Sequence, residues 1–278
     1  MALSLQRHLV RARADLRFHP MQTRLRAELE GHQVADTTAG FIVWEPRRVV
    51  PSYAVPADDV QADLEPARAP EDEPTSAALG SDLVLTPAAP FRYHSTPGTP
   101  YDVRAEDGPV AEQAAFRPDD SDLAHTVFLD FAAFDWWEEN EKAISHPRDP
   151  FHRIDIRPAA RHVEVRFDGR TLADSDHALI LTETSLPPRW YFPRADVAMD
   201  LLEPSDHKTT CAYKGHADHF SMPASAEGDA IAWTYEKPLH EAAGVAHAVA
   251  FYNERVDVLV DGELQDRPRT PWARARGH

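Results

Sequence analysis

The second half of the chain alternates between hydrophobic and polar residues over short stretches that turn-forming residues separate. His162–Phe167 alternates with period two and is followed by Asp168-Gly169, a dipeptide typical of two-residue hairpin turns. The pattern predicts further strands at residues 170–173, 178–182, 190–192, 208–213, 219–222, 231–235 and 256–260. Between them, Pro193 is expected to open a short helical turn, because proline is well tolerated at the first helical position.

One longer helix is expected in each half. His240–Glu254 places Val245, Val249 and Tyr252 at helical spacing. The corresponding segment of the first half is about Leu123–Asn140. The chain is therefore expected to be mainly β, of α+β class. Each half would be a small twisted sheet or partial barrel of about seven short strands, braced by one helix.

The two halves repeat one another. Six residues of the first half recur 138 positions later: Gly31, Ala35, Asp36, Ile42, Glu45 and Tyr53 correspond to Gly169, Ala173, Asp174, Ile180, Glu183 and Tyr191. Further along, the spacing is 117 residues, and Gly98, Ala115, Ala133 and Phe134 correspond to Gly215, Ala232, Ala250 and Phe251. A period above 100 residues predicts two tandem domains rather than a solenoid.

These registers suggest domain boundaries. We expect a lead-in helix at 1–19, an N-terminal copy at 20–144, a proline-stiffened linker at 145–161 and a C-terminal copy at 162–278. The smaller spacing after the first register implies that the N-terminal copy carries an insertion. This insertion, at 67–90, is rich in alanine, proline and acidic residues and is expected to be a loop.

Charge and cysteine content restrict the class of partner. The net charge of −17 argues against nucleic acid and against anionic membrane surfaces. Part of this charge is local, because eight acidic residues and one arginine lie between Ala57 and Asp82. No apolar run reaches the length of a membrane span. Cys211 is the single cysteine, which excludes an intramolecular disulfide and favours a cytoplasmic location.

Candidate chemistry is concentrated in the polar run Asp206–Gly215. The N-terminal copy has Tyr93–Gly98 in its place and has lost most of the reactive side chains. Because alternate residues of a strand share a face, one face of this run is expected to present four polar or reactive groups. They are His207, Thr209, Cys211 and Tyr213. This contrast between the copies suggests one working pocket and one scaffolding pocket.

Two reactive interpretations of this run are open. In the first, Cys211 is a nucleophile and His207 its base, since a nearby cation stabilises the thiolate. The two residues are about 13 Å apart along an extended strand, so direct contact would require a bend. In the second, zinc is bound by His207, Cys211, His216 and His219, but their spacing matches no specific zinc pattern, and no metal site is assigned.

The third interpretation is small-molecule binding, and it is the one we favour. The predicted ligand-binding residues are Lys214, Tyr213, Thr209, Trp190, Trp233 and Tyr235. Lys214 would pair with an anionic group and the aromatic side chains would form the walls, a composition common in small-molecule pockets. Glu183 has a counterpart in the degenerate copy, Glu45, so we interpret it as structural.

The run Asp206–Gly215, followed by Ala217, Phe220 and Trp233, resembles the domain-of-unknown-function-427 family, which also carries a nucleotidyltransferase-like label. The resemblance covers residues 158–278 and, in decayed form, about 20–150. The resemblance implies a small β-rich fold and a family with no established activity. It also implies that this chain is a member with two tandem copies of the domain. The label itself has no support in these residues, because the sequence has neither a glycine-rich phosphate loop nor an Asp-x-Asp pair.

The sequence thus predicts a cytoplasmic protein whose C-terminal copy binds a small anionic or polar-aromatic metabolite, with no cofactor specified. One alternative is a small-molecule enzyme that uses Cys211 and His207. Another is an assembly protein that docks through the acidic loop. Because fused copies of a dimerising domain reproduce the dimer interface within one chain, we also expect the two copies to pack about a pseudo-two-fold axis.

Overall fold

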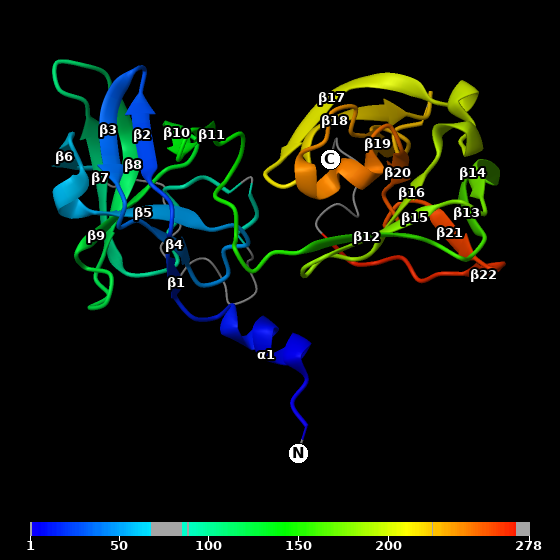
Figure 1. The fold of residues 1–278 in the computed structure, drawn as a ribbon, viewed down its shortest axis with the longest axis horizontal. Helices are drawn as coiled ribbons and strands as arrows, with labels where there is room; N and C mark the ends of the chain where they lie inside the picture. The colour runs from blue at the N-terminus through cyan, green and yellow to red at the C-terminus, as the bar shows by residue number, and fades with distance from the viewer. Residues whose placement is uncertain (1, 68–84, 88, 224, 271–278) are drawn as a thin grey trace. The chain divides into compact units, whose positions relative to one another are not determined.

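The computed structural model of the protein divides into two compact units (Figure 1). We call Met1–Asp149 the N-terminal unit and Pro150–His278 the C-terminal unit. The residues that the structure describes are 2–67, 85–87, 89–223 and 225–270. The acidic loop expected at 67–90 lies mostly outside these residues.

The N-terminal unit contains a seven-stranded and a four-stranded antiparallel sheet. The seven-stranded sheet has, in spatial order, β1 (Arg17–Pro20), β4 (Phe41–Trp44), β5 (Ser52–Pro56), β9 (Thr126–Leu129), β8 (Val110–Pro118), β7 (Gly98–Arg104) and β6 (Asp63–Pro66). The four-stranded sheet has β11 (Glu141–Lys142), β10 (Asp135–Glu138), β2 (Leu25–Leu29) and β3 (His32–Thr37). The helical elements are α1 (Leu5–Ala12) and the short 3-10 helix η1 (Ala57–Asp59).

The C-terminal unit has the same two sheets. The seven-stranded sheet has β12 (Ile154–Pro158), β15 (Leu179–Glu183), β16 (Arg189–Phe192), β20 (Val249–Phe251), β19 (Ala232–Thr234), β18 (Gly215–Ser221) and β17 (Glu203–Cys211). The four-stranded sheet has β14 (Arg170–Ser175), β13 (Val163–Phe167), β21 (Asp257–Val260) and β22 (Glu263–Leu264). Its 3-10 helices are η2 (Arg194–Asp196), η3 (Met199–Leu201) and η4 (His240–Val245).

The strand order of one unit maps strand for strand onto the other, so the units are two copies of one fold. A hydrogen-bonded turn is also repeated. Thr37 Oγ1 lies 2.6 Å from an Asp59 carboxylate oxygen, and Ser175 Oγ lies 2.6 Å from one of Asp196. In each copy the same hydroxyl accepts a backbone N–H from two residues further on, at 2.9 Å. The duplication inferred from residue spacing is therefore visible in both sheets and turns.

Each unit buries a core between its two sheets. In the C-terminal unit this core combines Val163 and Val165 of β13 with Phe192 of β16 and Phe251 of β20. The N-terminal unit places Leu25, Ala27 and other β2 side chains against β5 and β9 in the same way. Strand alternation puts the intervening side chains on the opposite face of the seven-stranded sheet. In the described residues neither sheet closes into a barrel.

The mainly β fold and the strands predicted for the C-terminal copy are confirmed. Asp168 and Gly169 form the predicted tight turn between β13 and β14, with φ angles of 48° and 73°. Two consecutive left-handed residues are the signature of the hairpin turn whose twist matches that of the flanking strands. The N-terminal copy has the same turn at Glu30 and Gly31.

The prediction of one long bracing helix in each copy was wrong. In the segment 240–254 a short 3-10 helix, η4, is followed by His247 in the left-handed region (φ 63°) and then by strand β20. In the segment 123–140 the chain forms β9 and β10 instead. The helical spacing of Val245 and Val249 does not mark one face of a helix. Val249 is buried between the two sheets, whereas Val245 packs on the opposite face of the seven-stranded sheet. A strand that is covered on both faces has too many apolar positions for its period to be recognised.

The segment expected to link the copies, 145–161, contains β12, which pairs with β15 at the edge of the seven-stranded sheet. Ile154 and Ile156 alternate in it and pack against the buried cluster of the outer face. The division between the units falls between Asp149 and Pro150. The lead-in segment 1–19 contains α1, whose N-cap Ser4 accepts the backbone N–H of Arg7 at 3.4 Å, and the start of β1.

Candidate functional site

The predicted functional residues gather mainly on one face of the C-terminal unit's seven-stranded sheet. We call this face, which points away from the four-stranded sheet, the outer face. Tyr191, Trp233 and Tyr235 form a buried cluster there, while the neighbours in sequence of Tyr191 point into the core between the sheets. Helix η4 packs on this face, since Ala242 and Val245 belong to the same cluster.

The predicted alternation along the polar run is confirmed. His207, Thr209 and Cys211 are half-buried, whereas Lys208 and Thr210 between them are exposed. The strand β17 ends at Cys211, and Tyr213 is buried in the turn that follows. The polar run therefore presents one side to the outer face, as the sequence suggested.

Lys214 is held by Glu183 rather than standing free to meet an anion. Its Nζ donates to Glu183 Oε2, and the Glu183 side chain is only 6% exposed. The other carboxylate oxygen lies 2.9 Å from His152 Nε2, and the His152 ring stacks on Tyr213 at 4.0 Å. Glu183 thus connects β15, the strand-connecting turn at Lys214 and the start of the C-terminal unit.

Two opposed effects act on the Glu183 carboxyl. Burial by itself would raise the pKa of Glu183, but the hydrogen bond from His152 and the charge and hydrogen bond of Lys214 outweigh it. The pKa of Glu183 consequently lies below its ordinary value of 4.5, and the group is ionised at neutral pH. The charge of Lys214 is therefore balanced inside the protein.

The aromatic part of the outer face is hydrogen-bonded as well. Trp233 Nε1 donates to Tyr191 Oη at 3.2 Å, and the Trp233 ring lies 4.6 Å from that of Tyr252. Burial, followed by the neighbouring phenol of Tyr191, raises the pKa of Tyr235 well above its ordinary value, and burial also raises the pKa of Tyr191. These phenols stay neutral at physiological pH, so they can act as hydrogen-bonding groups but not as bases.

Two histidines complete this side of the sheet. Thr209 Oγ1 lies 2.9 Å from Nε2 of His219, a residue that is only 1% exposed. The His207 ring lies 4.4 Å from the His219 ring, and the His219 ring is roughly parallel to that of Tyr252 at 6.3 Å. His207 thus contacts a second imidazole, whereas the extended strand separates it from Cys211 by about 13 Å along the backbone.

A buried ion pair that the sequence analysis missed supports the aromatic rings. Arg189 donates to both carboxylate oxygens of Glu254, each at 2.6 Å, and Thr270 donates to the same carboxylate at 2.6 Å. The Arg189 guanidinium lies 5.8 Å from the ring centre of Trp233. Because alternate residues of a strand share a face, Arg189 lies on the same outer face as Tyr191. This alternation is the one feature of the sequence that could have identified Arg189 as part of the site.

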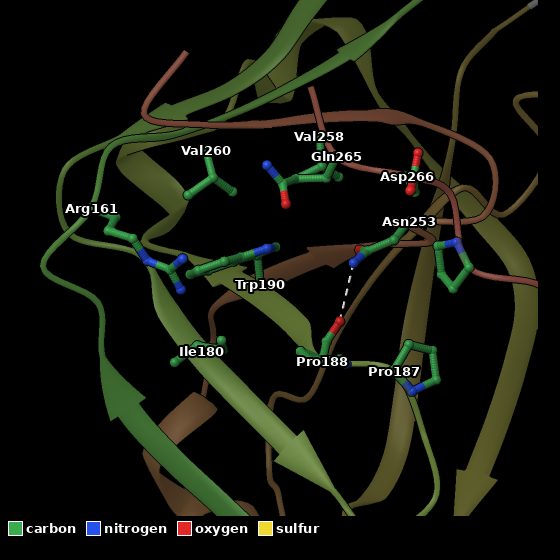
Figure 2. Close-up of a pocket in the computed structure, with 11 residues that line it drawn as sticks. Arg161, Ile180, Pro187, Pro188, Trp190, Asn253, Val258, Val260, Gln265 and Asp266 are labelled. Atoms are coloured by element: carbon green, nitrogen blue, oxygen red, sulfur yellow. Dashed lines mark hydrogen bonds between the residues drawn. The ribbon is translucent and has the colours of Figure 1, made fainter. Parts of the chain in front are cut away.

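Trp190 is not part of this group. It points to the opposite side of β16 and lines a pocket of about 320 Å³ at the edge of the sheet pair (Figure 2). The structure therefore brings together five of the predicted ligand-binding residues, Lys214, Tyr213, Thr209, Trp233 and Tyr235, and places the sixth elsewhere.

Within the part of the chain that the structure describes, no group of three or more His, Cys, Asp or Glu residues is arranged to hold a metal ion. The zinc candidate His216 has its Nδ1 2.8 Å from Thr210 Oγ1 on the exposed side of the hairpin. His219, by contrast, is buried on the outer face. The candidate zinc ligands are therefore divided between the two sides of the β17–β18 hairpin.

At the sheet positions equivalent to the aromatic cluster, the N-terminal unit has apolar residues. The shared sheet registers place Ala54 at the position of Tyr191, Phe116 at that of Trp233 and Pro100 at that of His219. The correspondence of Tyr53 with Tyr191 was therefore wrong by one residue. Tyr53 lies in the core between the sheets, as Trp190 does, because the loop before β5 is one residue longer than its counterpart before β16.

The buried glutamate is retained in that unit with different partners. Glu45 accepts from Arg48 Nε at 3.2 Å and from the backbone N–H of Ser95 at 3.0 Å, and His94 Nδ1 lies 3.0 Å away. The His94 ring stacks on Phe116 at 3.6 Å. The structural role predicted for Glu45 and Glu183 agrees with these contacts: Glu45 binds a turn backbone N–H as well as side chains, and the Glu183 carboxylate binds the side chains of His152 and Lys214.

Comparison with known families gives one finding. Residues 155–262 match the family described as Domain of unknown function (DUF427). The matched segment lies within the C-terminal unit and contains β12 to β21 apart from the first residue of β12. No curated protein matches the chain. A search of the described helices finds none that is both long and apolar enough to cross a membrane.

Proposed function

We propose that the C-terminal unit binds a small, uncharged polar-aromatic molecule on its outer face. The observation that carries this proposal is the contrast between two copies of one fold. At three equivalent sheet positions the C-terminal unit has a phenol, an indole and an imidazole, where the N-terminal unit has alanine, phenylalanine and proline. Packing alone is satisfied by the apolar set, so the polar set calls for another reason.

The charge balance of this face favours an uncharged ligand. Glu183 neutralises Lys214, and Glu254 neutralises Arg189. An incoming anion would have to displace a buried carboxylate from Lys214 or Arg189. The anion would lose its hydration, and the number of charge pairs would not increase. A planar ring with hydrogen-bonding groups instead matches the half-buried rim of imidazole, hydroxyl and phenol groups at His207, Thr209 and Tyr252.

The proposal divides the residues of the outer face between direct contact with the ligand and support of the site. Trp233 and Tyr252 provide ring surface, and Thr209 and His207 provide hydrogen bonds at the rim. Lys214 and Tyr213 act indirectly, because they fix Glu183 and His152 beneath the site. Lys214 and Tyr213 are therefore positioning residues in this proposal.

The test uses tryptophan side chains as reporters on the full chain. The indole N–H signals of 15N-tryptophan-labelled protein are assigned by single Trp→Phe variants, and nucleosides such as adenosine and uridine are titrated as uncharged heterocyclic probes. We expect the Trp233 signal to move in a saturable way, and we expect Thr209→Val together with His207→Ala to weaken binding by at least tenfold. Lys208→Ala, on the exposed side of β17, is the matched control and should leave binding unchanged.

Either of two results would contradict the proposal. One is that no heterocyclic probe moves the Trp233 signal at millimolar concentration. The other is that binding survives unchanged in the double variant while its melting temperature equals that of the wild type, because the rim residues would then have no role.

A further inference from the structure

We propose that the pocket beside Trp190 is a second binding site, separate from the outer face, and that it takes a planar aromatic carboxylate bearing a hydrogen-bond donor at its far end. The pocket lies between β15–β16 of the seven-stranded sheet and β21 of the four-stranded sheet, and residues that follow β22 also line it (Figure 2). Its volume of about 320 Å³ is at the small end of the range for small-molecule sites.

The pocket exists because two large side chains of the N-terminal unit are small in the C-terminal unit. The registers of β10 and β21 place Trp136 at the position of Val258 and Glu138 at the position of Val260. In the N-terminal unit, Trp136 packs on Tyr53 with ring centres 4.5 Å apart, and Tyr53 Oη donates to Glu138 at 2.6 Å. Since Tyr53 occupies the place of Trp190, the same site is filled in one copy and hollow in the other.

The walls of the pocket are suited to an aromatic ring. Ile180, Val258, Val260 and the ring of Trp190 present apolar surface on several sides. Trp190 is 7% exposed, so most of its surface is already packed and its position is fixed. A flat ring can therefore enter against Trp190 without ordering a mobile side chain first.

The charged groups of the pocket define the two ends of its ligand. Arg161 lies over the Trp190 ring at 5.0 Å and forms no ion pair with any residue that the structure describes. Figure 2 shows Asp266 at the opposite end of the pocket from Arg161. A carboxylate at the Arg161 end would pair with the guanidinium, which binds carboxylate in a bidentate manner, and an amino group at the Asp266 end would donate a hydrogen bond to the Asp266 carboxylate.

Amide side chains complete the polar set. Asn253 Nδ2 donates to the backbone oxygen of Pro188 at 3.1 Å, which fixes the amide and leaves its oxygen as an acceptor. Gln265 Nε2 donates to the Glu263 backbone oxygen at 2.9 Å. The pocket thus offers two amide oxygens between its cationic and anionic ends, which can accept hydrogen bonds from a donor substituent on the ring.

The experiment titrates 6-amino-2-naphthoate, and its uncharged carboxamide as the matched probe, into the full chain with the same tryptophan labelling. We expect the acid to move the Trp190 signal and leave Trp233 unperturbed, and to bind at least tenfold more tightly than the carboxamide. Arg161→Gln should abolish this preference, whereas Arg170→Gln, an equal change of charge at an exposed site, should keep it. Val258→Trp copies the N-terminal unit and should reduce binding of both probes by at least tenfold.

The proposal is overturned if the acid and the carboxamide bind equally, if Arg161→Gln keeps the preference, or if the acid moves Trp233 and not Trp190. Should Val258→Trp fail to fold, the Arg161→Gln comparison decides, because Arg161 is exposed at the mouth of the pocket. The outer-face proposal depends on Trp233 and on uncharged heterocycles, so either proposal can fail while the other stands.

Discussion

A buried glutamate contacts one cationic side chain and one histidine ring in both copies of this fold, but the cationic side chain differs between the copies. Glu183 has Lys214 and His152, and Glu45 has Arg48 and His94. The cation was therefore exchanged while the carboxylate remained. Removing the carboxylate would strand a positive charge in each unit, whereas the cation can be replaced from a neighbouring segment.

Replacing Glu183 with glutamine should destabilise the C-terminal unit by about 3 kcal/mol, because it leaves the Lys214 charge buried without its partner. Urea denaturation followed by the assigned Trp233 indole N–H signal measures the change. Asp218→Asn is the matched control. It breaks the Lys208–Asp218 pair, whose side chains are about half exposed, and should cost less than about 1 kcal/mol. Equal losses in the two variants would contradict the role given to Glu183.

The same variant gives a pH signature. Because the pKa of Glu183 is depressed in the folded protein, its ionised form stabilises the fold above the ordinary value of 4.5, and this stabilisation is lost as the pH falls through the folded pKa. The stability difference between wild type and Glu183→Gln should therefore be constant near neutral pH and shrink below about pH 4.5. A series of urea titrations at decreasing pH measures it, and a difference that stays constant under acid would refute the assignment.

At the residue scale, the sequence predicted which side chains share a face but not which of them pair. Alternation was enough to group His207, Thr209 and Cys211. The partner of Lys214 lies 31 residues away, in β15, and only the sheet register brings the two together. A one-residue difference in the loop before β5 likewise hid the correspondence of Tyr53 with Trp190, since a strand shifted by one residue exchanges its faces.

The elements of the fold depend on tight turns with left-handed residues. Gly169, with φ 73°, has no neighbouring atom within 4 Å of the position that a β-carbon would occupy. Gly169→Ala should therefore cost only conformational strain, about 1 kcal/mol, and Gly169→Asn should recover part of it because asparagine tolerates this region. Thermal denaturation of both variants measures the effect. An alanine variant as stable as the wild type would show that the turn can change type.

At the element scale, alternation identified the strands that have one exposed face, and the strands that were mistaken for helix are buried on both faces. In β13, the pattern of alternating burial made the strand easy to recognise. All residues of β9 and β20 are buried, and the flanking residues completed a false helical period. His247, with φ 63°, gives no sequence signal that a helix ends there, because histidine is not a typical left-handed residue at a helix end.

At the scale of the whole molecule, the two copies differ in opposite ways on the two faces of one sheet. On the outer face the C-terminal unit is more polar, with Tyr191 and His219 in place of Ala54 and Pro100. Between the sheets it is less filled, because Val258 stands in place of Trp136. The first difference adds buried polar groups, and the second removes packing that the N-terminal unit keeps. This is the expected direction if one copy supports structure and the other binds ligands, since sites for ligands trade stability for function.

Each unit has its own buried core, so residues 150–278 should fold without the rest of the chain. Amide NMR spectra of this fragment and of the full chain provide the measurement. Most C-terminal signals should coincide, and a spectrum of narrow dispersion from the fragment would contradict independent folding. Its matched control is the fragment 1–149, which should fold by the same argument.

The amide signals that differ between each fragment and the full chain test the pseudo-two-fold packing that the duplication leads us to expect. In an isologous interface the same patch is used by both partners. The residues perturbed in the C-terminal unit should then correspond, through the shared sheet registers, to those perturbed in the fragment 1–149 when it is compared with the full chain. Perturbations on unrelated surfaces would indicate a heterologous contact. Perturbations confined to the residues beside Asp149 and Pro150 would mean that the units are joined only by their connecting chain, and the two binding sites would then act independently of the N-terminal unit.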